Sequence, residues 1–472
     1  MSLPAACEHP PLAESLREEL GQLLGTRFST SASVREHHGS DISALDPMPP
    51  DAVAYANSLE DIVSISSACY RHDTPMIAYG SGTSLEGWLQ ASHGGVSIDV
   101  SGMNQVLAIR VDDMDATVQP GVTRKQLNAA LHGTGLFFPI DPGADASLGG
   151  MAATRASGTN AVRYGTMREN VLAMTAVLAD GRVINTGGRA RKSSAGYDLT
   201  HLLVGSGGTL ATIAELTVKL HPIPEAISAA VCRFPSVDLA VRAVIQIIQL
   251  GVPVARIELL DALTMRALNA YSSTQLREAP SLLFELHGSE AGVKEQIETV
   301  RMVADEHQGM DFEWAVHPED RSRLWQARHD GYFAALALRP GCRALTTDAV
   351  VPISRLAECI EATAADLAQN GFLAPIFGHV GDGNFHAVIL VDPHNPDEIE
   401  RAEGVAHRLA ERAIALQGSC TGEHGIGLTK QHFMAVEHGQ NAVDVMQSIK
   451  AALDPKQLMN PGKIFPRGRS AG

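Results

Sequence analysis

The chain changes character at His221-Pro222-Ile223-Pro224, where two prolines stand one residue apart. Proline lacks a backbone N–H and fixes φ, so neither a helix nor a central strand should run through this segment. At 472 residues with 45% hydrophobic content, the chain is long enough for two or three domains. We therefore expect a first domain over residues 1–222, a second over 223–454, and a segment of residues 455–472 that packs back on the first.

The first half contains short strands and helices joined by glycine-rich turns. A strand over Pro75 to Tyr79 leads into the turn Gly80 to Ser84, and such a turn exposes backbone N–H groups to a phosphate. Three familiar motifs are not matched here. Leu85 stands where GxGxxG requires its third glycine, the lysine of the Walker motif is absent, and Glu86 stands where GxSxG requires its last glycine. A tight surface turn is an equally good interpretation at this point.

A second segment of small residues, Asp141 to Gly165, favours a ligand. Such a run cannot fill a core, but its backbone can lie against a flat, extended molecule and donate hydrogen bonds to it. Two loops of this kind in one domain indicate a bound dinucleotide. A third tight turn, Gly205 to Leu210, precedes the last strand. Since strands and helices do not alternate regularly here, a doubly wound nicotinamide-binding fold is disfavoured.

After the prolines, strands and helices alternate from Ala226 to Leu453. This alternation fits an antiparallel sheet with helices packed on one face, so the predicted fold class is α+β.

Charge and cysteine usage exclude some classes of function. The net charge of −16 argues against nucleic acid as a partner, because such a partner requires a basic face. Six cysteines without a CxxC pair indicate neither a disulfide framework nor a thiolate zinc site. Residues Met1 to Leu24 lack the pattern of a signal or transit peptide, and no apolar run approaches the roughly 20 residues that span a bilayer. We expect a cytoplasmic protein without a transmembrane segment, with peripheral membrane association left open.

A candidate metal site lies in the segment Gly378 to His386. Apolar β-type residues flank this segment and Asp382-Gly383 lies at its centre, which predicts two strands joined by a type I′ turn. Counting outward from that turn pairs His379 with His386, so the two imidazoles could hold one metal ion. The alternative is a pair of ordinary polar strand ends.

Farther along, Glu423 and His424 stand between two glycines, which allow backbone to come close to a ligand. Together with His379 and His386, Glu423 would give a His₂Glu set, a recognised zinc arrangement. Arg328, on a predicted helix, is a candidate for binding a carboxylate, although a surface ion pair is the commoner role for such a residue.

These segments, in this order and over nearly the whole chain, resemble the flavin-linked oxidases and dehydrogenases of the vanillyl-alcohol oxidase fold, and most of all their D-lactate dehydrogenase branch. The resemblance rests on six motifs: Gly80 to Ser84, Asp141 to Gly150, Gly205 to Leu210, His379 to His386, Gly422 to Gly425, and Asn460 to Lys463.

The resemblance implies FAD in a two-part domain formed by the first half, with the pyrophosphate on the first two loops. Covalent relatives usually have a histidine in the first loop, where this chain has Thr83 and Ser84, so we expect non-covalent FAD. The residues expected to contact it are Tyr79, Gly80, Ser81, Gly82, Thr83, Ser84, Pro142, Gly143, Asp145, Ser147, Gly149, Gly150, Ala153, Ser157, Gly158, Gly208, Thr209, Ile213 and Asn460.

The resemblance also implies roles for residues of the second half. His379, His386 and Glu423 match the ligands of a divalent metal, which we expect to be zinc rather than manganese. His424 matches a catalytic base that also touches the substrate, and Arg328 matches the arginine that binds the substrate carboxylate.

Two departures from the family pattern bear on the substrate and the flavin. Hydroxyglutarate relatives carry a lysine and an asparagine where we align Thr346 and Val388, so a smaller acid is favoured, with Thr346 still expected at the substrate. In the third turn, relatives read Gly-Ser-Glu-Gly-Thr-Leu-Gly, whereas this chain has Gly208 and Ala211. This departure puts any role of the missing glutamate in doubt, but flavin binding as such is still expected.

The expected reaction is the FAD- and metal-dependent oxidation of a small D-2-hydroxy acid, D-lactate above all, with hydride passing from Cα to flavin N5. Electrons would then go to an external acceptor, which is a cytochrome, a quinone or an electron-transfer flavoprotein, and a homodimer is left open. Glycolate and D-2-hydroxyglutarate are alternative substrates. From other classes, a zinc hydrolase using the same three ligands and a non-enzymatic flavin- or metal-binding module remain as alternatives.

Overall fold

The structure is a computed structural model that describes residues 9–43, 45–273 and 275–465. The chain divides into two compact units. The central unit comprises Gly158–Tyr164 and Pro224–Gly422, and the N-terminal unit comprises residues 9–157, Gly165–Ile223 and residues 423–465. The chain enters the central unit next to the two prolines, but residues 423–454 group with the N-terminal unit, whereas the sequence pattern assigned them to the second domain.

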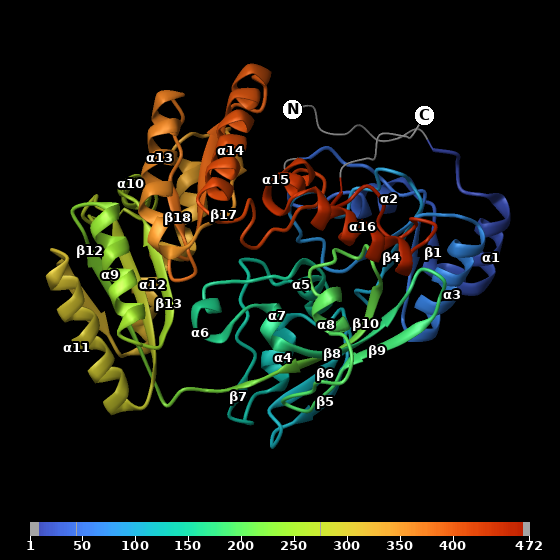
Figure 1. Cartoon of the computed structure of the whole chain (residues 1–472), viewed down its shortest axis with the longest axis horizontal. Coiled ribbons are helices and arrows are strands. Elements are labelled where there is room, and N and C mark those ends of the chain that lie inside the picture. Colours follow the sequence, from blue (N-terminus) through green and yellow to red (C-terminus); the bar gives the residue numbers. More distant parts are fainter. Residues whose placement is uncertain (1–8, 44, 274, 466–472) are drawn as a thin grey trace. The chain divides into compact units, whose positions relative to one another are not determined.

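Two sheets form the frame of the N-terminal unit (Figure 1). In the first, β4 runs parallel to both β2 and β3, while β1 is antiparallel to β2. The second sheet is antiparallel throughout. The strand order of the first sheet is β1 (Phe28–Ser29), β2 (Ala52–Tyr55), β4 (Val96–Asp99), β3 (Met76–Tyr79). The strand order of the second sheet is β5 (Val106–Arg110), β6 (Asp115–Val118), β10 (Thr212–Lys219), β8 (Val171–Val177), β9 (Val183–Gly187). A separate pair is formed by β7 (Leu136–Phe137) and β11 (His221–Pro222).

The helices of this unit begin where the sequence provides capping side chains. The Ser58 side chain accepts from the Asp61 N–H at the start of α3, and Thr123 and Gln126 form a capping box at α4. Residues 1–8 of the segment Met1 to Leu24 lie outside the described residues, and α1 is the first helix of the described chain. The helices are α1 (Glu14–Leu24), α2 (Ala32–His38), α3 (Leu59–Arg71), α4 (Arg124–Ala130), α5 (Leu148–Thr154), α7 (Met167–Asn170) and α8 (Leu199–Leu203), with α6 (Ala161–Tyr164) in the central unit.

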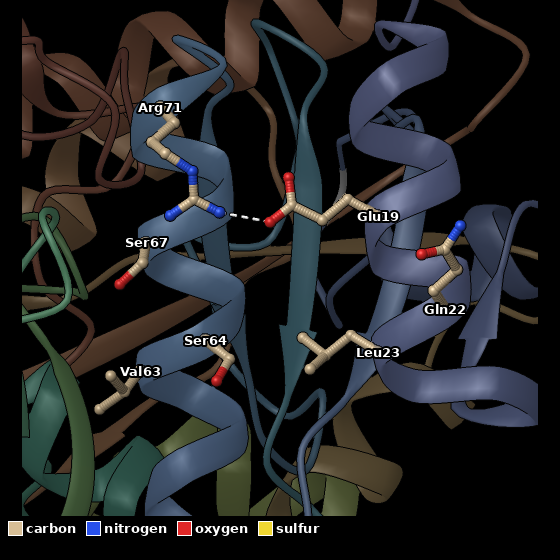
Figure 2. Close-up of a pocket in the computed structure, with 7 residues that line it drawn as sticks. All are labelled: Glu19, Gln22, Leu23, Val63, Ser64, Ser67 and Arg71. Atoms are coloured by element: carbon tan, nitrogen blue, oxygen red, sulfur yellow. Dashed lines mark hydrogen bonds and ion pairs between the residues drawn. The ribbon is translucent and has the colours of Figure 1, made fainter.

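A surface groove lies between α1 and α3 (Figure 2). The Arg71 guanidinium and the Glu19 carboxylate form an ion pair across it, and the remaining lining residues are Gln22, Leu23, Val63, Ser64 and Ser67. None of these side chains belongs to a motif of the sequence, so the groove contributes nothing to the candidate site.

The returning C-terminal segment is fastened to the N-terminal unit by buried polar contacts. Lys450 Nζ donates to Thr209 O at 2.7 Å, to Met459 O at 2.9 Å and to the Asp454 carboxylate. Before Lys450, Gly439 adopts a φ of 78° and separates α15 (Met434–His438) from α16 (Gln440–Leu453). Residues 466–472 of the expected C-terminal segment lie outside the described residues.

One antiparallel sheet organises the central unit (Figure 1). Its order is β15 (Met310–Ala315), β12 (Ala226–Arg233), β14 (Ser281–Gly288), β13 (Val254–Leu260), β18 (Ile376–Gly378), β19 (Asn384–Val391) and β16 (Arg343–Thr346), with β17 (Ala349–Val350) also paired to β19. Thr347 and Asp348 lie between the two short strands β16 and β17.

Helices pack on both faces of this sheet, which corrects the expectation of one covered face. One apolar cluster joins the sheet to α9 (Val237–Gln249), α11 (Glu290–Glu306), α13 (Leu356–Gln369) and α14 (Pro396–Ala415). A second cluster joins the opposite face to α10 (Ala262–Ser272) and α12 (Pro318–Ala337). The physical reason is visible in β12 and β14, where consecutive rather than alternate residues are buried, so both faces require cover. Among the described helices, none combines the length and apolar character needed to cross a membrane.

The hairpin of β18 and β19 differs in register from the predicted one. Phe377, not His379, lies opposite His386, so the two strands are connected by the loop 379–383. The prediction of a two-residue type I′ turn is therefore wrong. In this loop, the backbone N–H groups of Asp382 and Asn384 both donate to His379 O. The register shift is two residues, and the side-chain period of a strand is also two, so His379 still lies on the same face as His386. Their ring centroids are 5.7 Å apart.

Replacing Lys450 by Met should destabilise the protein by about 3–5 kcal/mol, because the buried Asp454 carboxylate would lose its cation. The matched control is Lys456→Met, which removes a half-exposed ammonium paired with Asp73 and should cost at most about 1 kcal/mol. Urea unfolding of both variants measures the difference. Equal losses would show that the Lys450 contacts do not hold the returning segment.

Candidate functional site

The two histidines of the β18–β19 hairpin are buried, and each is oriented through Nδ1. His379 Nδ1 lies 2.5 Å from Glu258 Oε1, and His386 Nδ1 lies 2.9 Å from Thr347 O. Because a carboxylate and a carbonyl only accept hydrogen bonds, Nδ1 carries the proton in both rings, which leaves the lone pair of each neutral ring on Nε2. Both rings are therefore prepared to act as Nε2 metal ligands.

Glu423 completes a candidate metal centre. Among the described residues, one group of His, Cys and acidic side chains could hold an ion, and it consists of His379, His386 and Glu423, whose ligand atoms all lie within 4.8 Å of one another. Glu423 is one peptide bond from Gly422, whose N–H donates to Asp348 Oδ2 at 2.8 Å. The backbone at Glu423 is therefore positioned by a contact made within the central unit.

The buried Asp348 carboxylate organises the segment before Glu423. Besides the Gly422 N–H, it accepts from Thr421 Oγ1 at 2.7 Å and from Asn384 Nδ2 at 2.8 Å. Asn384 follows the histidine loop directly, so one carboxylate links the hairpin to the Glu423 segment.

Arg328 lies on α12 and is paired with a buried acid rather than with a surface one. Its Nε donates to Glu258 Oε2 at 2.6 Å, and its guanidinium lies over the Phe377 ring, 5.0 Å from the centroid. The Glu258 side chain is fully buried. Although burial raises the pKa of Glu258, the hydrogen bond from His379 and the hydrogen bond and charge of Arg328 lower it to about 2.

The two positions expected to discriminate between substrates face each other in the sheet. Thr346 on β16 pairs with Val388 on β19, two residues beyond His386 and on the same face. Val388 is fully buried, whereas Thr346 is partly exposed. Neither side chain can neutralise a second carboxylate.

In the N-terminal unit, the first two glycine-rich loops touch. The Ser147 N–H donates to Ser81 Oγ at 3.1 Å, and a Cβ on Gly80 would lie 2.5 Å from Ser147 Oγ. A side chain at position 80 would therefore displace the Ser147 hydroxyl. Of the other expected residues, Gly149, Gly150 and Ala153 lie on α5, which follows Ser147, whereas Gly158 belongs to the central unit.

The third turn packs on α5 and on the C-terminal segment. The Gly207 N–H donates to Ala153 O at 2.8 Å, and Asn460 Nδ2 donates to Gly207 O at 2.8 Å and to Trp88 O at 3.2 Å. Thr209, by contrast, turns its hydroxyl back to Ser206 O. The structure thus brings residues of all three loops together with Asn460.

Several expected cofactor residues make contacts within the protein. The Tyr79 hydroxyl shares a hydrogen bond with His37 Nε2 at 3.1 Å, and Asp145 Oδ1 accepts from the Lys125 N–H. Ile213 lies buried on β10, and around Gly143 an added Cβ would meet nothing within 4 Å. The remaining positions, Gly82, Thr83, Ser84, Pro142, Ser157 and Gly208, lie in or beside the three loops.

These loops suit an extended polar ligand. Ser147 Oγ and Asn460 Oδ1 are buried and have no hydrogen-bond partner among the described residues. Buried polar atoms in native proteins are normally paired, so such atoms beside glycine-rich backbone indicate groups that a ligand satisfies. The donors and acceptors present are consistent with FAD.

His424 is held by residues of the N-terminal unit. Its Nδ1 lies 3.5 Å from Glu86 Oε1, and its backbone carbonyl accepts from Trp88 Nε1 at 3.0 Å. Glu86 also pairs with Lys430 Nζ at 2.9 Å. Burial raises the pKa of Glu86, but Lys430 and His424 lower it to about 2, so this carboxylate is charged at neutral pH.

The carboxylates that hold the functional side chains were not among the predicted site residues. Glu258 and Asp348 lie far from the histidines in the sequence. Glu86 was considered only because it occupies the position where GxSxG requires its last glycine. A usable signal existed for Glu258 and Asp348, since each is an acid within a stretch that otherwise reads as a buried strand. Acids in such positions need donors from elsewhere in the fold.

Asp348→Asn should destabilise the protein by about 1–3 kcal/mol, because an amide would direct N–H groups at donors that the carboxylate now satisfies. The control Asp397→Asn changes an exposed residue in the first turn of α14 and should stay within about 0.5 kcal/mol of the parent protein. Thermal and urea unfolding provide the comparison. An Asp348 variant as stable as its control would contradict the role given to this carboxylate.

Comparison with known proteins identifies related chains for both units. Residues 50–187 match the model of an FAD binding domain, and residues 223–464 match the model described as FAD linked oxidases, C-terminal domain. A probable mitochondrial D-lactate dehydrogenase of Danio rerio is 51% identical over 93% of this chain and 88% of its own. A mitochondrial D-lactate dehydrogenase [cytochrome] of Arabidopsis thaliana is 42% identical over 97% of this chain and 81% of its own.

Among solved structures, p-cresol methylhydroxylase with substrate bound matches with a TM-score of 0.76 at 17% identity, over 96% of both chains. At that identity the match shows the fold alone, and it agrees with the predicted α+β class. The expected cytoplasmic location is wrong: the two relatives above and two further ones are named as mitochondrial proteins.

Proposed function

The chain belongs to the family of FAD-linked oxidases and is an FAD-dependent oxidoreductase, and on this premise we propose that it oxidises D-lactate to the 2-oxo acid. The observation that carries the proposal is the group of His379, His386 and Glu423, together with the arginine that shares Glu258 with His379. A metal and a guanidinium in one site suit a 2-hydroxy carboxylate. The names of the relatives support lactate as that acid.

Arg328 is the proposed carboxylate-binding residue. Its Nε is engaged by Glu258, and the guanidinium has four further N–H groups, which can bind a carboxylate through two parallel hydrogen bonds. Substrate size is proposed to follow from Thr346 and Val388, which offer no positive charge to a second carboxylate. This supports lactate over 2-hydroxyglutarate.

Two imidazoles and one carboxylate fit a divalent metal, and imidazole ligands favour zinc over manganese. Bound there, the ion would supply a Lewis acid that lowers the pKa of the substrate hydroxyl. The chain's own contribution is to keep both Nε2 lone pairs available through the hydrogen bonds at Nδ1.

His424 is the proposed base that takes the hydroxyl proton. Glu86 fixes the side of the ring that carries Nδ1, and Trp88 fixes its backbone. FAD, when bound by the three loops, supplies the acceptor for the two electrons that leave the substrate. We propose a cytochrome as the external acceptor and a mitochondrial location, on the names of the relatives.

His424→Ala should slow the reduction of bound flavin by D-lactate about 10²–10⁴-fold, the usual contribution of a general base. The flavin content should not change, because none of the loops expected to bind FAD depends on this imidazole. Anaerobic stopped-flow absorbance measures the reduction. The control His438→Ala removes an exposed imidazole of α15 and should behave as the parent protein does. Reduction at the parent rate in the His424 variant would rule out its role as the base.

A further inference from the structure

We propose that Glu258 is a positioning residue that sets two parts of the site at once, the metal ligand His379 and the carboxylate-binding Arg328. This inference rests on the proposed function and adds to it a residue that couples metal affinity to substrate affinity.

The sheet register places Glu258 beside the histidine loop. Leu259 on β13 pairs with Gly378 on β18 in antiparallel register, so Glu258 stands opposite the next residue, His379. A Cβ at Gly378 would lie 2.5 Å from Phe385 Cα, so glycine there permits the close approach of β18 and β19. The position of Glu258 is thus set by strand pairing and not by a flexible loop.

Each oxygen of Glu258 has one donor, and the two donors serve different purposes. Oε1 accepts from His379 Nδ1 at 2.5 Å, and Oε2 accepts from Arg328 Nε at 2.6 Å. The carboxylate is fully buried, so losing either donor would be costly and both are held firmly. The first bond fixes Nε2 of His379 as the metal-binding atom, and the second fixes the plane of the guanidinium.

The neighbouring strand offers a matched control. Glu285 on β14 is also a buried carboxylate next to a histidine and an arginine, with Oε1 2.8 Å from His287 Nε2 and 3.5 Å from Arg256 Nε. Neither of those partners belongs to the candidate metal centre. Replacing Glu285 therefore imposes the same chemical change on the same sheet without touching His379 or Arg328.

The test compares Glu258→Gln and Glu285→Gln in the full-length, FAD-loaded protein. After chelation of the resident metal, zinc affinity is measured by competition with a chromophoric chelator, without turnover. Zinc binding by Glu258→Gln should weaken about 10- to 100-fold, the usual effect of losing the carboxylate behind a ligating histidine. The Glu285 variant should bind zinc as the parent protein does.

Steady-state kinetics provide the second readout. In Glu258→Gln, saturating zinc should restore most of kcat, because it repopulates the weakened metal site, but KM for D-lactate should stay raised since Arg328 remains misplaced. A purely structural role for Glu258 would not separate kcat from KM in this way. Should Glu258→Gln fail to fold, Glu258→Asp keeps the charge on a shorter side chain, and the same two changes are expected in smaller size.

Parent-like zinc affinity and KM in the foldable Glu258 variant would overturn the inference, and so would equal losses in the Glu258 and Glu285 variants. Failure of the proposed function looks different. In that case the parent protein itself would bind no zinc or would not be reduced by D-lactate, and the inference would fall with it.

Discussion

The site depends on one constraint, which is that a buried carboxylate must be met by donors. Glu258, Asp348 and Glu86 are each withdrawn from solvent, and each draws together side chains from separate parts of the chain. Glu258 joins a helix to a hairpin, Asp348 joins that hairpin to the Glu423 segment, and Glu86 holds His424. Because removing a donor leaves part of a buried carboxylate without a hydrogen bond, these contacts are costly to break, and a fixed position is what a metal ligand or a base requires.

In the N-terminal unit, glycines allow segments of backbone to pack closely. Gly207 adopts a φ of 60°, and a Cβ there would lie 1.8 Å from the Trp88 ring. Gly425, which follows His424 in the motif Gly422 to Gly425, has a φ of 77° and also lies against the Trp88 ring. Trp88 is thus the common contact of the third turn and the His424 segment, and side chains at either glycine would separate them.

Local patterns in the sequence predicted the elements and the three loops, because strand periodicity and glycine-rich turns are encoded by neighbouring residues. These local patterns did not predict the register of the β18–β19 hairpin. Asp382-Gly383 is a strong type I′ signal, yet Asn384 N–H bonding to His379 O produced a longer loop. His379 and His386 still meet because the shift equals the side-chain period of the strand.

What could not be predicted is long-range pairing. No residue near Glu258 in the sequence indicates that Glu258 contacts His379 and Arg328. Likewise, no residue near Asp348 indicates its contact with Gly422. The helices on the second sheet face likewise follow from tertiary contacts, although the run of apolar residues in β14 indicates that both of its faces are buried. Carboxylates inside apolar strands are therefore a useful guide to functional networks.

The most direct test is the visible spectrum of the purified, FAD-loaded protein during anaerobic addition of D-lactate, recorded with its divalent metal and after complete chelation. D-lactate should bleach the flavin of the metal-loaded protein and L-lactate should not, and chelation should abolish the bleaching until zinc is returned. A flavin that D-lactate does not bleach, or one bleached equally fast after all metal is removed, would contradict a metal-assisted oxidation of D-lactate.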